Sequence, residues 1–177
     1  MRILGAFCAL FLSVAASVAG AAEPIGGMFT LTRLSENDWS ASYCFDAPVQ
    51  GIKFTRPMSG DMRQNYWAPA DDNFILYSET LGRETIAVLQ RSDGALFECA
   101  EVKLQTYTKL PEKNYLAFAK FSDGGASVYT GYYTGQVMFE GYWVDTALAA
   151  RYVPQDGNHV ITRDAEKLVH QFVYFGP

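Results

Sequence analysis

The sequence has 177 residues, of which 49% are hydrophobic and 15% aromatic, and its formal net charge is −5. Acidic residues outnumber basic ones by 19 to 14, and no cluster of lysine and arginine could follow a phosphate backbone. This composition argues against nucleic acid as a partner.

The N-terminus has the pattern of a secretory signal. One positive charge precedes an apolar run over residues 3–18, which is too short to span a bilayer and is followed by small residues in an A-x-A arrangement. We therefore predict a signal peptide over 1–22, cleaved after Ala21 or Ala22. The remaining segment, 23–177, is expected to form a single domain that is periplasmic or secreted and free of the membrane after cleavage.

Alternation of polar and apolar side chains predicts short β-strands along the whole mature segment. The expected strands cover 28–34, 39–45, 52–55, 74–77, 85–90, 96–105, 115–121, 126–133, 136–144, 159–162 and 171–175. Only 145–152 and 164–170 resemble helix, and both are too short for the crossovers of a parallel sheet. The fold class is thus all-β, an antiparallel β-sandwich or alternatively an irregular or lipocalin-like barrel.

Glycine-containing turns separate several of these strands. Those at 92–94 and 122–125 are expected to join antiparallel neighbours. The segment 56–73 has proline, glycine and charge with little periodicity, which indicates a long loop or a distorted hairpin. Within it, the run 71–73 (Asp-Asp-Asn) could hold calcium or do acid–base work, but its place between a proline and a strand favours a turn.

Two cysteines, Cys44 and Cys99, are left in the mature segment. Export would place them in an oxidising compartment, so we expect a disulfide between them. Cys44 alternates with the apolar side chains of its strand, and Cys99 falls on the same face as Glu101 and Lys103. The bridge is therefore predicted on the outer face of the sheet or at its margin.

No complete catalytic motif is present. The zinc-peptidase pattern His-Glu-x-x-His and the Gly-x-Ser-x-Gly nucleophile motif are both missing, and no cofactor motif occurs. A zinc site from His159, Glu166 and His170 is conceivable, but a helix-side Glu/His pair and a strand histidine explain these residues more simply. The sequence thus predicts no enzyme, no metal and no cofactor.

Aromatic residues cluster in two runs that are expected to form one hairpin around Thr134-Gly135. They are Tyr129, Tyr132, Tyr133, Tyr142 and Trp143. Because adjacent residues of a strand point to opposite faces, at least one of Tyr132 and Tyr133 should lie outside the core. This arrangement makes the cluster a candidate contact surface, although aromatic cross-strand pairs that stabilise the sheet would explain it as well.

The hydrophobic pattern and turn placement of most of the mature segment resemble a known family. The stretches concerned are 39–48, 51–54, 116–118, 121–125, 129–131 and 173–177. Together they resemble the N-terminal β-domain that precedes the catalytic domain in exported gluzincin metallopeptidases of the glycyl-aminopeptidase kind. In such enzymes the zinc ligands lie in a later, thermolysin-like domain, so the resemblance implies a stand-alone or truncated module that ends at Pro177.

Three functional hypotheses follow. The first is a non-catalytic exported module that binds a protein or peptide. The second is an accessory substrate-binding module of a separately encoded zinc aminopeptidase. The third is a small lipocalin-like carrier, which would need an enclosed apolar cavity.

Overall fold

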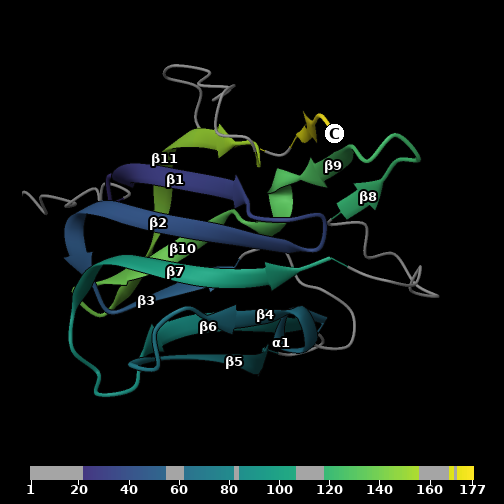
Figure 1. The fold of residues 1–177 in the computed structure, drawn as a ribbon. Helices are drawn as coiled ribbons and strands as arrows, with labels where there is room; N and C mark the ends of the chain where they lie inside the picture. Colours follow the sequence, from purple (N-terminus) through teal and green to yellow (C-terminus); the bar gives the residue numbers. More distant parts are fainter. Residues whose placement is uncertain (1–21, 55–61, 82–83, 107–117, 156–167, 170) are drawn as a thin grey trace, which may run out of the picture.

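The computed structural model describes residues 22–54, 62–81, 84–106, 118–155, 168–169 and 171–177 (Figure 1). Residues 1–21 of the predicted signal peptide 1–22 and the residues of the conceivable zinc site, His159, Glu166 and His170, lie outside these described residues.

The described chain is almost entirely β, which confirms the predicted fold class. Its elements are β1 (Ile25–Arg33), β2 (Asp38–Val49), β3 (Gly51–Phe54), α1 (Met62–Tyr66), β4 (Trp67–Pro69), β5 (Phe74–Leu81), β6 (Glu84–Arg91), β7 (Phe97–Gln105), β8 (Phe118–Lys120), β9 (Ala126–Tyr129), the 3₁₀ turn η1 (Thr130–Tyr132), β10 (Gly135–Phe139), β11 (Tyr142–Val153) and β12 (Phe172–Phe175).

Nine strands form one large mixed sheet in the order β4-β7-β2-β1-β11-β10-β3-β6-β5. The strands at the two ends of this order, β4 and β5, follow each other in the chain, and the sheet is nearly barrel-shaped. The architecture is therefore closer to the irregular barrel than to a sandwich of two separate sheets. All described pairs are antiparallel except β1 with β11, so the expectation of a wholly antiparallel sheet is wrong at this pair.

The strand β11 covers the segment 145–152, which was expected to be helical. Its alanines and leucine favour a helix in isolation. In the fold, however, β11 pairs with β10 along its first part and with β1 along the rest, so each part of the strand has a partner for its backbone hydrogen bonds. Tertiary pairing here outweighs local propensity.

Two of the predicted connections need correction, and one is confirmed. The turn 122–125 joins the antiparallel neighbours β8 and β9, as expected. The turn 92–94 instead carries the chain from β6 to β7, which are not neighbours in the sheet. The described part of the expected loop 56–73 contains α1 and the strand β4, which pairs with β7.

The acidic run after β4 forms a turn, as the sequence predicted. The Asp71 carboxylate accepts a hydrogen bond from the backbone N–H of Asn73 at 2.8 Å, and the Asp71 carbonyl accepts one from the N–H of Phe74 at 3.0 Å. Asp71 and Asp72 are exposed. Their positions are thus explained by turn geometry.

The predicted alternation decides which side chains enter the barrel. In β2 the buried face carries Trp39, Ala41, Tyr43 and Phe45. Cys44 lies on the other face, directly opposite Cys99 of β7 in the antiparallel register.

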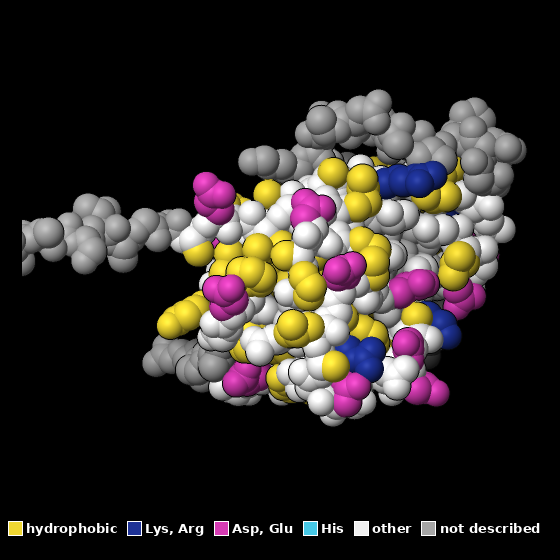
Figure 2. All heavy atoms as spheres, turned by 90° about the vertical axis from the view of Figure 1, so that its left-hand side faces the viewer, with side chains coloured by type: hydrophobic (Ala, Val, Ile, Leu, Met, Phe, Trp, Pro, Cys, Tyr) yellow, Lys and Arg dark blue, Asp and Glu magenta, His cyan; other side chains and the backbone are white. Residues whose placement is uncertain are grey.

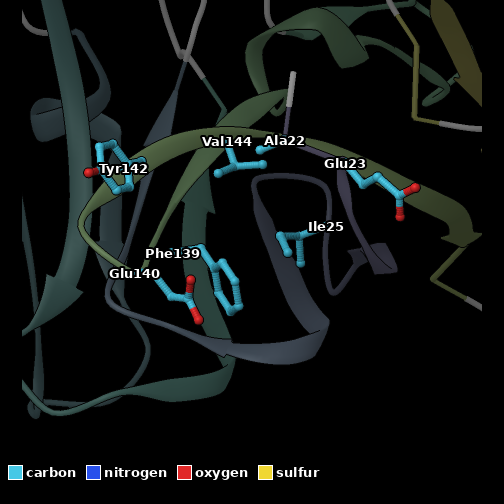
Figure 3. A pocket seen from close by; sticks show the side chains of 7 residues that line it. All are labelled: Ala22, Glu23, Ile25, Phe139, Glu140, Tyr142 and Val144. Atoms are coloured by element: carbon cyan, nitrogen blue, oxygen red, sulfur yellow. The ribbon is translucent and has the colours of Figure 1, made fainter. Parts of the chain in front are cut away.

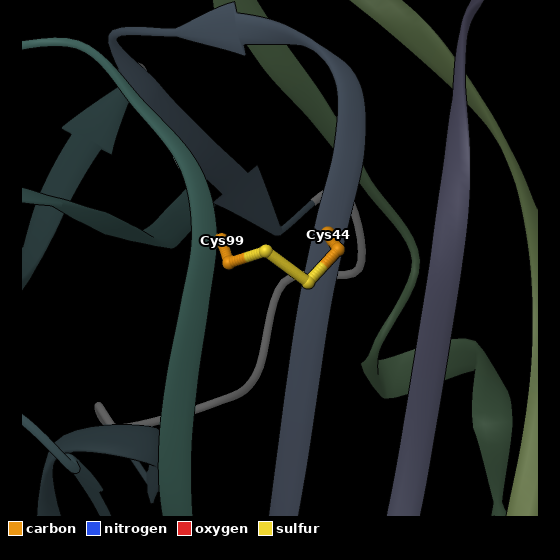
Figure 4. The surroundings of a disulfide bond; sticks show 2 residues. All are labelled: Cys44 and Cys99. Atoms are coloured by element: carbon orange, nitrogen blue, oxygen red, sulfur yellow. A yellow bond between two sulfur atoms is a disulfide. The ribbon is translucent and has the colours of Figure 1, made fainter.

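The sulfurs of Cys44 and Cys99 are bonded, and the two Cα atoms are 4.1 Å apart (Figure 4). Cys44 is half-buried and Cys99 is exposed. The predicted disulfide and its position on the outer face of the sheet are confirmed.

Aromatic rings fill the described interior. Trp67 stacks on Tyr133 with ring centroids 5.2 Å apart, and Phe54 meets Trp67 edge-on at the same distance. Arg63 of α1, only 2% exposed, places its guanidinium 5.0 Å from the Trp67 ring centroid and donates a 2.9 Å hydrogen bond to the carbonyl of Tyr132. These contacts fill the described interior around Trp67 with side chains.

The three-stranded sheet β12-β9-β8 lies at one end of the barrel, on the right of Figure 1. Trp39 packs edge-on against Phe175 of β12, with centroids 4.6 Å apart. The buried Arg33 donates hydrogen bonds to the carbonyls of Gly176 at 2.6 Å and Gly124 at 2.7 Å. Apolar packing and these two bonds join the small sheet to the barrel.

The buried hydroxyl of Tyr43 predicts loss of stability at alkaline pH. It donates a 3.1 Å hydrogen bond to the carbonyl of Tyr133, and burial raises the pKa of Tyr43, a shift that the charge of Arg63 only partly opposes. The folded pKa lies above the unfolded value of about 10. The contribution of Tyr43 is therefore complete below pH 10 and is lost above it, because only the unfolded chain can ionise there.

We expect the free energy of unfolding to fall more steeply above pH 10 in the wild type than in Tyr43→Phe, by up to about 1.4 kcal/mol per pH unit. Urea unfolding at pH 8, 10 and 11 measures the difference. Ionisation of the other tyrosines contributes equally to the free energy of unfolding of both proteins and therefore cancels in the comparison. Parallel pH profiles for the two proteins would contradict this account.

Candidate functional site

The five aromatic residues of the predicted contact surface do not form one surface. Tyr142 is 76% exposed, Trp143 and Tyr129 are partly buried, and Tyr132 and Tyr133 are 7% and 0% exposed. The expectation that Tyr132 or Tyr133 faces solvent is therefore wrong.

The burial of both tyrosines has a local cause. The strand β9 ends at Tyr129, and the chain then enters the 3₁₀ turn η1, closed by a hydrogen bond from the N–H of Tyr133 to the carbonyl of Thr130 at 2.9 Å. Strand alternation no longer applies there, so neighbouring side chains can both point inward. The glycine at 131, inside the expected strand, is the signal that could have indicated this break.

The aromatic hairpin also has a different turn from the expected one. β10 and β11 pair around Glu140 and Gly141, with Phe139 directly opposite Tyr142. Both turn residues have positive φ, 49° at Glu140 and 84° at Gly141, as in the two-residue turns that match the twist of a hairpin. The sequence signal was the Glu-Gly pair between two alternating runs.

This hairpin forms one wall of a pocket at the mouth of the barrel, shown in Figure 3. The pocket has a volume of about 350 Å³ and is lined by Ala22, Glu23, Ile25, Phe139, Glu140, Tyr142 and Val144. We call it the mouth pocket.

The register of the strands explains why the pocket is apolar. Val137 of β10 is fully buried and lies opposite Val144 of β11. Phe139 and Tyr142 are two residues further along their strands, so they continue the same inward face to the rim of the barrel. The pocket is thus the outer end of the hydrophobic core, where the core meets solvent.

The opening itself arises where β11 changes partner. Asp145 is the last β11 residue paired with β10, and Thr146 is the first paired with β1, opposite Ile25. Pro24 precedes Ile25 and has no backbone N–H, so it cannot donate a hydrogen bond that would extend the ladder. The lining residues come from the two segments that precede this point, the end of the hairpin and the chain up to Ile25 at the start of β1.

Two carboxylates stand in the lining, Glu23 on one wall and Glu140 at the hairpin turn. In Figure 3 Glu140 lies beside the Phe139 ring, while Glu23 and Tyr142 lie on opposite sides of the view. No lining residue is basic. Figure 2, a view of the end of the molecule that lies on the left of Figure 1, shows hydrophobic side chains across this face, with acidic side chains and some Lys or Arg side chains among them.

The lining of the mouth pocket is mostly apolar. Its lining offers apolar walls, two carboxylates and one phenol, with no histidine, cysteine, serine or lysine among the seven residues. Among the residues that the structure describes, no three His, Cys, Asp or Glu side chains come together in a way that could hold a metal ion. Within the same residues, no helix has the length and apolar character needed to cross a membrane.

Comparison with known proteins finds no counterpart: no protein-family model matches the chain, nor does any curated protein or solved structure. The resemblance to the N-terminal domains of gluzincin peptidases stays a prediction from the sequence.

Proposed function

We propose that this protein is a non-catalytic binding module that holds an apolar segment of a peptide or protein in the mouth pocket. The observation that carries the proposal is the position of Tyr142, a ring 76% exposed at the rim of an apolar pocket of about 350 Å³. Tyrosine is favoured at binding surfaces because its ring packs on apolar groups while its hydroxyl stays in water.

The construction of the barrel supports the same proposal. Stacked rings such as Trp67 and Tyr133 occupy the described interior, whereas the mouth pocket is open to solvent. The cross-strand disulfide fits an exported protein, because such bonds persist in oxidising compartments. Export would bring the pocket into contact with peptides and proteins outside the cytoplasm.

A displayed library of random heptapeptides, selected on the folded wild-type protein, tests the proposal. We expect enriched peptides to share an apolar residue and to bind Tyr142→Ser about tenfold more weakly, since a central aromatic contact contributes at least that much. The matched control is Phe172→Ser, because Phe172 of β12 is 65% exposed and lies in the small sheet at the end of the barrel.

Binding of the enriched peptides should be unchanged in Phe172→Ser. If no peptide is enriched, or if Tyr142→Ser binds as well as the wild type, the mouth pocket is not the binding site.

A further inference from the structure

One residue of the mouth pocket has an unusual backbone conformation for its type. Glu140 is the only non-glycine residue in the described part of the chain with a positive φ. At the first central position of such a turn, asparagine, aspartate and glycine are favoured, and a longer side chain is disfavoured. Residues held in disfavoured backbone conformations cluster at ligand-binding sites, so the side chain of Glu140 is a candidate ligand contact.

The side chain of Glu140 brings a negative charge to the edge of an apolar cavity. Glu23 also lies in the lining, but the predicted cleavage after Ala21 or Ala22 would leave a positive α-ammonium group beside it. Glu140 has no basic side chain in the lining to neutralise it. The rings of Phe139 and Tyr142 add aromatic faces, which attract cations through their negative charge density. Carboxylates and aromatic faces both favour a cation and disfavour an anion.

From this charge complementarity we infer that the mouth pocket is specific for a cation on an apolar stem, namely a lysine or arginine side chain beside an apolar residue of a bound peptide. The inference rests on the proposed function and names the chemistry of its ligand. The apolar stem packs on Ile25, Phe139 and Val144, and the ammonium or guanidinium group lies at the rim near Glu140. Long basic side chains suit such a site because their stems are apolar and their heads stay partly in water.

Three small probes with one apolar tail and different charges test the inference: hexylammonium, 1-hexanol and hexanoate. Each is titrated into the full folded protein, and its affinity is measured from the NMR shifts of the Ile25 and Val144 methyl groups. We expect hexylammonium to bind at least fivefold more tightly than 1-hexanol and hexanoate to bind most weakly. Raising the salt concentration should reduce the preference for the cation.

Glu140→Gln should bring the affinities for hexylammonium and 1-hexanol to within about twofold, because Glu140 supplies the negative charge at the rim. The matched control is Glu36→Gln in the turn after β1, at least about 26 Å along that strand from Ile25. It removes the same charge and should leave the preference intact.

The outcomes separate the inference from the proposed function. If hexylammonium and 1-hexanol bind the wild type equally, or if Glu140→Gln keeps the preference, the inferred specificity for a cation is wrong. The proposal that the mouth pocket binds apolar groups is unaffected by either result. If none of the probes shifts the pocket methyls, the inference is overturned, and the peptide selection with Tyr142→Ser decides whether the proposed function fails with it.

Discussion

Replacing Trp39 by alanine is expected to lower the free energy of unfolding by about 5 kcal/mol. The indole ring is fully buried, so its removal loses the transfer free energy of a large side chain and leaves a cavity. It also contacts Phe118 of β8 and Phe175 of β12, with ring centroids 5.1 Å and 4.6 Å away. Trp39→Ala therefore removes much of the apolar contact between the barrel and the small sheet.

Urea denaturation followed by circular dichroism measures this loss. Trp143→Ala is the matched control, because Trp143 is only partly buried and has the Lys53 ammonium 4.6 Å from its ring centroid on the outer face. We expect that variant to lose about 1 kcal/mol. Amide exchange in Trp39→Ala should show β9 and β12 opening before the barrel strands, and equal protection throughout would contradict the role of Trp39 in joining the two sheets.

Removing the disulfide by the double change Cys44→Ala and Cys99→Ala is expected to lower the free energy of unfolding by about 4 kcal/mol. The two cysteines are 55 residues apart in the sequence, and the cross-link restricts the unfolded chain accordingly. Loss of packing adds little, because Cys99 is exposed. The strands β2 and β7 remain paired on both sides of the site, so the folded structure should persist.

Guanidinium unfolding of the variant and of the wild type, with and without reductant, measures this effect. Reduced wild type should match the variant, and the dependence of the unfolding free energy on denaturant should steepen, because the unfolded chain without the cross-link exposes more surface. An unchanged unfolding midpoint in the variant would show that the bridge does not stabilise the fold.

Alternation along single strands could be predicted from the sequence because it depends on nearest neighbours only. The run that contains Tyr43 and Cys44 shows this, since one side chain enters the core and the next lies on the outer face. The same pattern in β7 placed Cys99 on the outer face. The disulfide itself was predicted from the expected export and from the two cysteines of the mature segment.

The candidate site was predicted less well. Of the five aromatic residues expected to share a surface, Tyr142 alone lines the mouth pocket, and Tyr133 is fully buried. The local turn type decided this difference: η1 ends the alternation after Tyr129, and the tight turn at Glu140 and Gly141 sets Phe139 opposite Tyr142. The dipeptide Glu-Gly is present in the sequence. That it brings Phe139 and Tyr142 together at a pocket depends, however, on the pairing of β10 with β11.

The sequence by itself therefore determined the all-β class, the inward and outward faces of the main strands and the pairing of the two cysteines. Only the tertiary structure decided that 145–152 is a strand, that β1 runs parallel to β11 and that a pocket opens where β11 changes partner at Thr146. The physical reason is the range of the interactions. A period of two is set within a few residues, whereas register and strand order depend on hydrogen bonds and packing between segments more than one hundred residues apart, such as Ile25 and Thr146.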